Sequence, residues 1–285
     1  MTPAHSTLAR LVTGALVIAL GLVAPAAAQT PRITQERLAA LASTPTPRLA
    51  DGRPDLSGMW DHLGGIEFVR PQTLANGSVC VRGCAPAAAA GAGTPVAQAP
   101  ATLPKYRPEL LAKVKDLSDR QVDTDTVLKC MPPGVPRIGP PQKIVMNARE
   151  AAFFYDDVSG GFFRIVPIDG RPHRAGLPPS YLGDAVGHFE GDTLVVETVN
   201  FNEETWLTDN GAFHSKGLRV VERLRRVGDT IQYEATAYDP AVLAEPWAAR
   251  PHVLWITDQE LEESARCEDR DLEHVVDGSH HTNPR

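Results

Sequence analysis

Short runs of alternating apolar and polar residues fill the chain from Lys143 onward, and turn residues separate them. Such alternation is typical of half-buried strands, because successive side chains of a strand point to opposite faces. Ser159-Gly160-Gly161 and Gly228-Asp229 are good hairpin turns between neighbouring runs. Nine short strands with few helices predict an all-β fold, an antiparallel meander that forms a closed or strongly curved barrel. The predicted strands span 143–147, 151–157, 162–168, 186–190, 193–201, 217–226, 230–238, 252–257 and 260–267.

Minor helical segments are predicted ahead of these strands. Apolar residues recur at helical spacing over 35–42 and again from Pro108 to Leu117, where the proline suits a first helical turn. The stretch from Lys129 to Pro141 holds too many prolines for a helix or a strand. We expect it to be a fixed, irregular crossing.

The composition divides the chain around one domain. Residues 29–54 form a lead-in segment, and a single β-rich domain is expected over 55–272. The loop at 85–104 is rich in Ala, Pro and Gly and has almost no large side chains, so we expect it to be flexible. The polar tail at 273–285 is predicted to be disordered.

The first residues predict export. Arg10 precedes an apolar run from Leu11 to Val23, and Ala26-Ala27-Ala28 offers the small residues at which signal peptidase cleaves. Residues 1–28 are therefore expected to be a signal peptide, and the mature protein periplasmic or secreted. No later stretch approaches the roughly 20 apolar residues that a membrane span needs, so no membrane span is predicted.

Charge and cysteine content narrow the function classes. The formal net charge of the 285-residue chain is −7 and no basic stripe occurs, which argues against nucleic acid as a partner. Four cysteines in an exported protein predict two disulfides. Of the three pairings, we favour Cys80–Cys84 with Cys130–Cys267, because Cys80 and Cys84 are close together in a loop-like region. A metal site is the weaker interpretation of these cysteines.

Acidic residues fall among apolar neighbours on three predicted strands. Glu197 alternates with Val195 and Val199, and Glu222 alternates with Val220 and Leu224 on the next strand. Asp239 ends the strand after that one. In an antiparallel barrel such faces look into one interior, where poor hydration raises carboxyl pKa values. The acids are therefore candidates for a general acid and base at neutral pH.

A structural interpretation explains the same residues. Arg164 lies on the strand face of Phe162 and Val166, so it is placed to neutralise one of the carboxylates in a buried ion pair. Asp239 precedes a proline at a strand end, as turn or capping acids do.

Several histidines stand close to other polar residues. His188 and Glu190 share a strand face, with Asp184 upstream and His173 in the preceding loop, which suggests a metal or acid–base cluster. Their spacing matches no strong metal motif, so we predict no metal. His214 follows a loop that carries Trp206 and precedes the strand of Glu222. This position makes His214 a general-base candidate, against a capping or solvent-exposed role.

The ordered motifs of the chain resemble a large family of exported bacterial proteins of unassigned function. The motifs are PDLSGMW, KCMPPGVPR, FFRIVPIDGRPH, GDAVGHFEGDTLVVETVNFNEETW, HSKGLRVVERLRR, YDPAVLAEPW and the final Cys267-Glu268-Asp269. They cover nearly the whole mature chain. The resemblance implies a single exported β-rich domain, and it carries no established activity or catalytic residue. Phe189 replaces the family's usual Trp, and the loop after Cys84 looks like an insertion.

Two main hypotheses of function follow, and neither needs a cofactor. The chain has no G-x-S-x-G elbow, no G-x-G-x-x-G or P-loop motif and no C-x-x-C-H, so serine hydrolase, nucleotide and haem chemistry are not indicated. The first hypothesis is an acid–base lyase, isomerase or hydrolase that uses Glu197, Glu222 and His214 on a small, partly apolar molecule. Residues Arg164, His173, Asp184, His188, Trp206 and Asp239 would bind that substrate.

The second hypothesis is a small-molecule binding protein without catalysis, in which a calycin-like barrel sequesters an apolar compound as lipocalins do. A structural or envelope interaction protein is the third reading, and a packed interior would favour it. The sequence predicts no particular oligomeric state.

Overall fold

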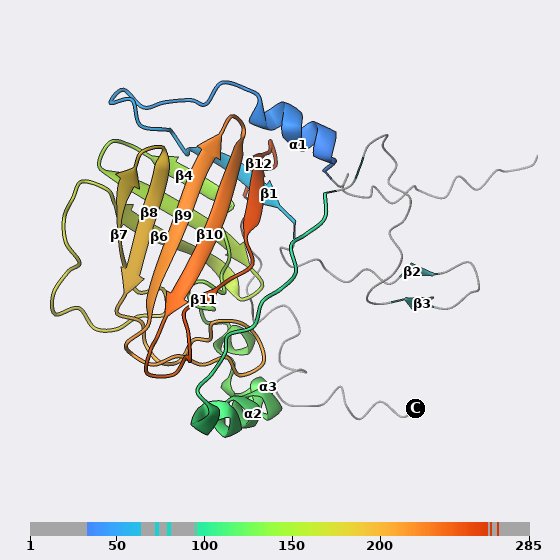
Figure 1. The fold of residues 1–285 in the computed structure, drawn as a ribbon, viewed down its shortest axis with the longest axis vertical. Coiled ribbons are helices and arrows are strands. Elements are labelled where there is room, and N and C mark those ends of the chain that lie inside the picture. Colours follow the sequence, from blue (N-terminus) through green and yellow to red (C-terminus); the bar gives the residue numbers. More distant parts are fainter. Residues whose placement is uncertain are drawn as a thin grey trace, which may run out of the picture. The chain divides into compact units, whose positions relative to one another are not determined.

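A computed structural model describes residues 33–63, 72–73, 79–80, 94, 96–261, 263 and 267 of the chain. Its main feature is one antiparallel sheet curved into a nearly closed barrel, so the all-β prediction is confirmed. Figure 1 shows β7 to β10 in front of β4 and β6, with the core between these two walls. The strands of the barrel are β1 (Gly58–His62), β4 (Lys143–Met146), β5 (Glu150–Asp157), β6 (Gly160–Pro167), β7 (Asp184–Glu190), β8 (Thr193–Val199), β9 (Arg219–Val227), β10 (Thr230–Tyr238), β11 (Trp247–Ala248) and β12 (His252–Ile256).

Nine of these strands follow one another in the order β6-β5-β4-β1-β12-β10-β9-β8-β7, and β11 pairs with β10 beside this path. Each neighbouring pair along the path is antiparallel. An odd number of alternating strands leaves the first and the last, β6 and β7, running in the same direction. In the described residues no ladder joins these two edges, and we call the line between them the seam.

The two edges of the seam nevertheless lie close together. A Cβ atom on Gly187 of β7 would approach Val166 Cγ1 of β6 to 3.1 Å and Ile168 Cγ2 to 2.9 Å. Glycine at this position therefore lets the inner faces of the two edge strands meet without a ladder. On β6, Pro167 lacks an N–H, as is tolerated on an edge strand.

Period-two burial separates an inner and an outer face of the barrel. On β8 and β9 the inner face carries Leu194, Val196, Val220 and Leu224, all fully buried. Large side chains fill the interior, and those with almost no exposed surface include Trp60, Phe153, Leu194, Leu224, Ile231, Tyr233 and Leu254. The interior is therefore a packed core.

Short helices cover the ends of the sheet. The helix α1 (Gln35–Ala42) was predicted, and it packs on the β9–β10 turn, where Asp229 N–H donates to the Leu41 carbonyl at 2.9 Å. The predicted second helix is η1 (Pro108–Leu110) followed by α2 (Leu111–Asp119). The remaining elements are α3 (Gln121–Thr124), η2 (Thr126–Lys129) and the two-residue strands β2 (Gln72–Thr73) and β3 (Val79–Cys80).

The irregular crossing after η2 is anchored by the predicted Cys130–Cys267 disulfide, whose Cα atoms are 5.5 Å apart. Cys84 and the predicted signal peptide lie outside the described residues, so these predictions stay untested. Within 260–267, the described residues form no strand, in contrast to the prediction. No helix in the described part of the chain is long and apolar enough to cross a membrane.

The end of the predicted flexible loop is held by hydrogen bonds. Gln35 N–H donates to the Thr94 carbonyl at 2.7 Å, and Val96 N–H donates to the Ile33 carbonyl at 3.3 Å. Thr102 Oγ1 donates to the Ala248 carbonyl at 2.6 Å. These hydrogen bonds hold the end of the loop in place, although its composition provides few apolar side chains for a core.

Candidate functional site

The barrel interior contains one buried ion pair between Arg164 of β6 and Glu222 of β9. Arg164 Nη2 donates to Glu222 Oε2 at 2.7 Å and Nη1 donates to Oε1 at 3.1 Å. The side chains are 3% and 0% exposed. Tyr233 Oη also donates to Glu222 Oε1 at 3.0 Å, and Thr198 Oγ1 accepts from Arg164 Nη2 at 2.7 Å.

This network supports the structural interpretation of Glu222 and Arg164. Both carboxylate oxygens and both terminal guanidinium nitrogens have partners, as buried charges require. Arg164 Nε is the one buried nitrogen of the pair without a hydrogen bond to the described residues. The pair links opposite walls of the barrel and leaves Glu222 no open position for a substrate.

Glu197 lies on the outer face, so its predicted inward position beside Glu222 is wrong. Glu197 pairs with Val221 across the β8–β9 ladder, whereas Glu222 pairs with Val196. Directly opposite residues share a face, and the two acids therefore lie on opposite sides of the sheet. The paired-acid mechanism loses its premise, because the carboxylates do not converge in one interior.

On the outer face Glu197 joins a cluster beside the seam. Glu197 Oε2 accepts from Arg219 Nη1 at 2.9 Å, and Glu197 Oε1 lies 3.4 Å from His173 Nε2. The same imidazole has its Nδ1 3.0 Å from Asp184 Oδ2. His173 Nε2 is buried and has no hydrogen-bond partner among the described residues, so Glu197 is a close polar neighbour without a hydrogen bond to it. The sequence therefore predicted correctly that His173 and Asp184 are neighbours.

Asp184 is the buried anchor of this cluster. Its Oδ1 accepts from Arg174 Nε at 2.8 Å and its Oδ2 from the Arg174 backbone N–H at 3.0 Å. Burial alone would raise the pKa of Asp184, but the hydrogen bonds from Arg174 and His173 outweigh it and hold the pKa below its usual value. Asp184 is thus an anion that positions the loop before β7.

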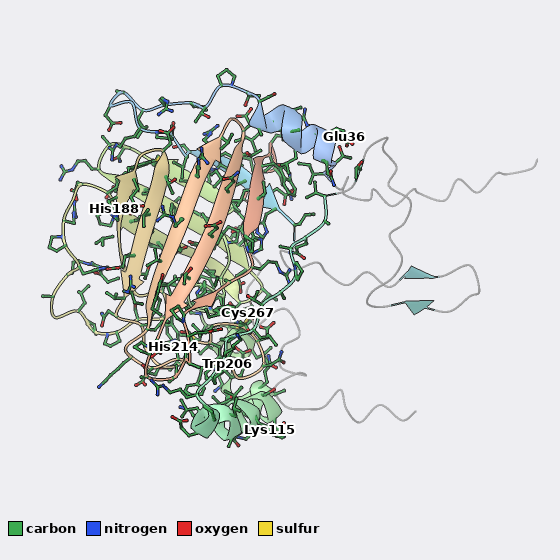
Figure 2. The ribbon with its side chains drawn as sticks, viewed as in Figure 1. Glu36, Lys115, His188, Trp206, His214 and Cys267 are labelled. Atoms are coloured by element: carbon green, nitrogen blue, oxygen red, sulfur yellow. A yellow bond between two sulfur atoms is a disulfide. The ribbon has the colours of Figure 1, made fainter. Side chains whose placement is uncertain are left out.

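His214 and Trp206 lie near α2, as Figure 2 shows. Asp239 is hydrogen-bonded to Ser215, the residue that follows His214. His214 is buried, with Nε2 2.8 Å from Thr205 Oγ1 and Nδ1 2.8 Å from the Ser215 carbonyl. Burial lowers the pKa of His214. Both ring nitrogens have partners and the ring is buried, which fits a structural role for His214.

Asp239 caps the loop that contains Ser215, in line with the capping alternative. Its carboxylate accepts from the Ser215 N–H at 2.6 Å and from Ser215 Oγ at 2.9 Å. Trp206 is buried in the core cluster. His188 points outward on β7, beside Glu190 at 3.3 Å, and lies apart from His214 in Figure 2. His173 contacts Asp184 and Glu197 instead, so among the described residues no ion-pair contact joins the partners of the two histidines.

Two adjoining pockets lie along the seam and are lined by residues of both edge strands. The larger has a volume of about 430 Å³, which we call the seam pocket, and the smaller has about 140 Å³. Arg174, Ile165 and Ala185 border both. The seam pocket is lined by Pro132, Phe163, Arg164, Ile165, Arg174, Ser180, Tyr181, Leu182, Gly183 and Ala185. Its volume falls in the range of small-molecule sites, and its wall is mainly apolar.

Two histidines that we did not single out from the sequence face the interior. His62 and His252 have ring centroids 5.0 Å apart in an edge-to-face contact, and His62 Nδ1 lies 3.1 Å from the Leu63 carbonyl. Burial lowers both pKa values, and together with repulsion from His62 it brings the pKa of His252 to about 4. Period-two analysis of GMWDH and HVLWI would have placed them on the faces of Trp60 and Leu254.

No three His, Cys, Asp or Glu side chains within the described ranges form a group suited to a metal ion. The larger of the two concave sites is the seam pocket, and Arg174, the partner of Asp184, borders it. Comparison with known proteins gives no further identification: no family model, curated protein or solved structure matches this chain.

Proposed function

We propose that this protein binds a small, partly apolar molecule in the seam pocket. The observation that carries the proposal is the pocket itself, about 430 Å³ in volume, with an apolar wall and a few polar groups. Ligand sites typically combine these features, because apolar contact supplies affinity and polar groups fix orientation. Phe163 and Ile165 leave much of their surface exposed there, which a bound molecule would cover.

The proposed ligand position differs from that of a lipocalin. Lipocalins hold their ligand inside the barrel, whereas the interior of this barrel is filled by the core and by the Arg164–Glu222 pair. The binding hypothesis therefore moves from the interior to the gap between the two edge strands.

Acid–base catalysis is the second candidate function, and one observation favours it. Asp184 holds His173 through Nδ1 at 3.0 Å, the arrangement that orients a histidine for proton transfer. The reacting nitrogen, Nε2, faces Glu197 at 3.4 Å, so a substrate would have to displace that carboxylate. Turnover that survives in His173→Gln would exclude this role.

Export to the periplasm or the medium is proposed as well. The Cys130–Cys267 disulfide supports an oxidising compartment, and the N-terminal pattern supports cleavage after Ala28. Cell fractionation with mass measurement of the mature N-terminus tests both. A cytoplasmic protein that retains Met1 would contradict the proposal.

Fluorescence titration with the neutral dye N-phenyl-1-naphthylamine tests binding. We expect Ile165→Asp to weaken dye binding at least tenfold, because it places a charge in the apolar wall. Val145→Asp is the matched control: it lies on the same outer face of the sheet, is 51% exposed against 45% for Ile165, and borders neither pocket. Equal binding by the two variants, or no dye binding by the wild type, would contradict the proposal.

A further inference from the structure

Arg174 occupies a distinctive position at the seam. It borders both pockets and comes from the loop that precedes β7. Two contacts to one carboxylate hold it: Nε donates to Asp184 Oδ1 at 2.8 Å, and the backbone N–H donates to Oδ2 at 3.0 Å. Asp184 is only 5% exposed, so the anchor is firm, while the Arg174 side chain is 68% exposed.

The terminal nitrogens of Arg174 remain available. A guanidinium has five N–H donors in a planar fork, and here only the Nε donor is used by the described residues. The remaining donors, on Nη1 and Nη2, make no hydrogen bond within the described part of the chain. An arginine held at Nε by a buried acid presents these donors in the geometry that binds a carboxylate through two parallel bonds.

The unused donors of Arg174 face a pocket whose lining has no acidic side chain, although the Nε of Arg174 is paired with Asp184. None of the residues lining that pocket is an aspartate or glutamate. Its other arginine, Arg164, is neutralised inside the barrel by Glu222 at 2.7 Å. In the smaller pocket, Arg171 is held by Asp169 at 2.6 Å. Arg174 therefore has the one guanidinium of these three whose terminal nitrogens have no partner among the described residues.

We propose that the ligand of the seam pocket is a monocarboxylate with an apolar body, and that Arg174 binds its carboxylate. This inference rests on the proposed function. The carboxylate lies against Nη1 and Nη2, and the apolar body covers Ile165, Leu182 and Phe163, which line the same pocket. Arg174 is thus the residue that selects acids over neutral molecules of the same shape.

Isothermal titration calorimetry with 4-phenylbutanoate and its neutral amide tests the inference directly. We expect the wild type to bind the acid at least tenfold more tightly than the amide. In Arg174→Gln this preference should fall close to one. Arg171→Gln is the matched control, because it removes a neighbouring arginine whose Nε and Nη2 both already donate to Asp169, and it should keep the preference.

The outcomes separate the inference from the proposed function. Equal affinity of the wild type for acid and amide, or a tenfold preference that persists in Arg174→Gln, overturns the inference even if the dye still binds. Binding of neither compound also overturns it, and absence of dye binding overturns the proposed function. If the corresponding phosphonate binds more tightly than the carboxylate, the assignment of a monocarboxylate ligand is overturned in favour of a tetrahedral anion. If Arg174→Gln fails to fold, Arg174→Lys keeps the charge without the fork and should likewise lose at least tenfold in acid affinity.

Discussion

Replacing Glu222 by Gln should destabilise the barrel strongly, because it removes a charge without removing its partner. The substitution keeps the size and shape of the side chain. It leaves the Arg164 guanidinium, 3% exposed, without a counter-charge, and it can turn an amide N–H₂ toward the donors that now meet Glu222 Oε2 at 2.7 Å. An unpaired buried charge keeps its desolvation cost and loses the attraction that offset it.

The expected loss is about 3–5 kcal/mol in the free energy of unfolding, the usual cost of breaking a buried pair. For a domain of this size, that corresponds to a fall of roughly 6–20 °C in Tm. Urea unfolding followed by circular dichroism measures the free energy, and an unchanged m-value would show that the unfolding transition remains comparable. Glu190→Gln is the matched control, because its pair with Arg223 is about half exposed and should contribute no more than about 1 kcal/mol.

A second variant separates charge from packing. Replacing Arg164 and Glu222 together by Met removes both charges, and we expect it to be more stable than Glu222→Gln. A Glu222→Gln protein within about 0.5 kcal/mol of the wild type would refute the reasoning, because ordinary surface substitutions already reach that value. A double variant less stable than Glu222→Gln would show that packing around the pair matters more than its charge.

Three further predictions concern covalent, electrostatic and backbone features. Replacing Cys130 and Cys267 by Ala should lower the free energy of unfolding by about 5 kcal/mol, less any strain, because the disulfide closes a loop with a sequence separation of 137; comparison of urea unfolding checks it. The free energy of unfolding should fall by about 2 kcal/mol, after allowance for partial exposure, as the pH drops from 6.5 toward 4. In this range His252 is protonated in the unfolded chain but stays neutral in the folded protein, where its pKa is about 4. His252→Gln should flatten this pH profile. Gly183→Ala should lower the free energy of unfolding by about 2 kcal/mol and Gly191→Ala by about 1 kcal/mol, as measured by thermal unfolding. Both glycines have positive φ, but of the two only Gly183 would place a Cβ 2.6 Å from a carbonyl oxygen. Equal losses would contradict the steric argument.

Local pattern predicted most of the elements, because alternation and turn residues act within a few positions. The helix over 35–42 and the two hairpins at Gly160 and Gly228 were located from such signals. The strand β1, Gly58–His62, was absent from the predicted strands since its five residues show little alternation. Pairing with β12 and β4 over long sequence distances stabilises it.

The site was less predictable, because strand faces on β8 are nearly equal in apolar character. Val195 and Val199 share the outer face with Glu197, while Leu194 and Val196 lie on the inner face. Both faces are therefore apolar, and Val195 is almost fully buried although it faces outward. Only the ladder to β9 decides which face is inside. The pocket depends on how the two edge strands lie against each other, and no local pattern in the sequence predicts that arrangement. The Arg164–Glu222 pair, by contrast, followed from placing one charge on each apolar face.

The unpaired seam between β6 and β7 has a consequence for the fluctuations of the barrel. The Ile168 N–H donates to the Arg149 carbonyl, so the N–H groups of the even-numbered residues of β6 point toward β5. Because the direction alternates along an antiparallel strand, the N–H groups of Phe163 and Ile165 point toward the seam. Amide protons without a ladder partner exchange with solvent far sooner than those between β9 and β10. The amides along the seam should therefore exchange with deuterium first, and a molecule bound in the seam pocket should slow the exchange of the amides that it covers.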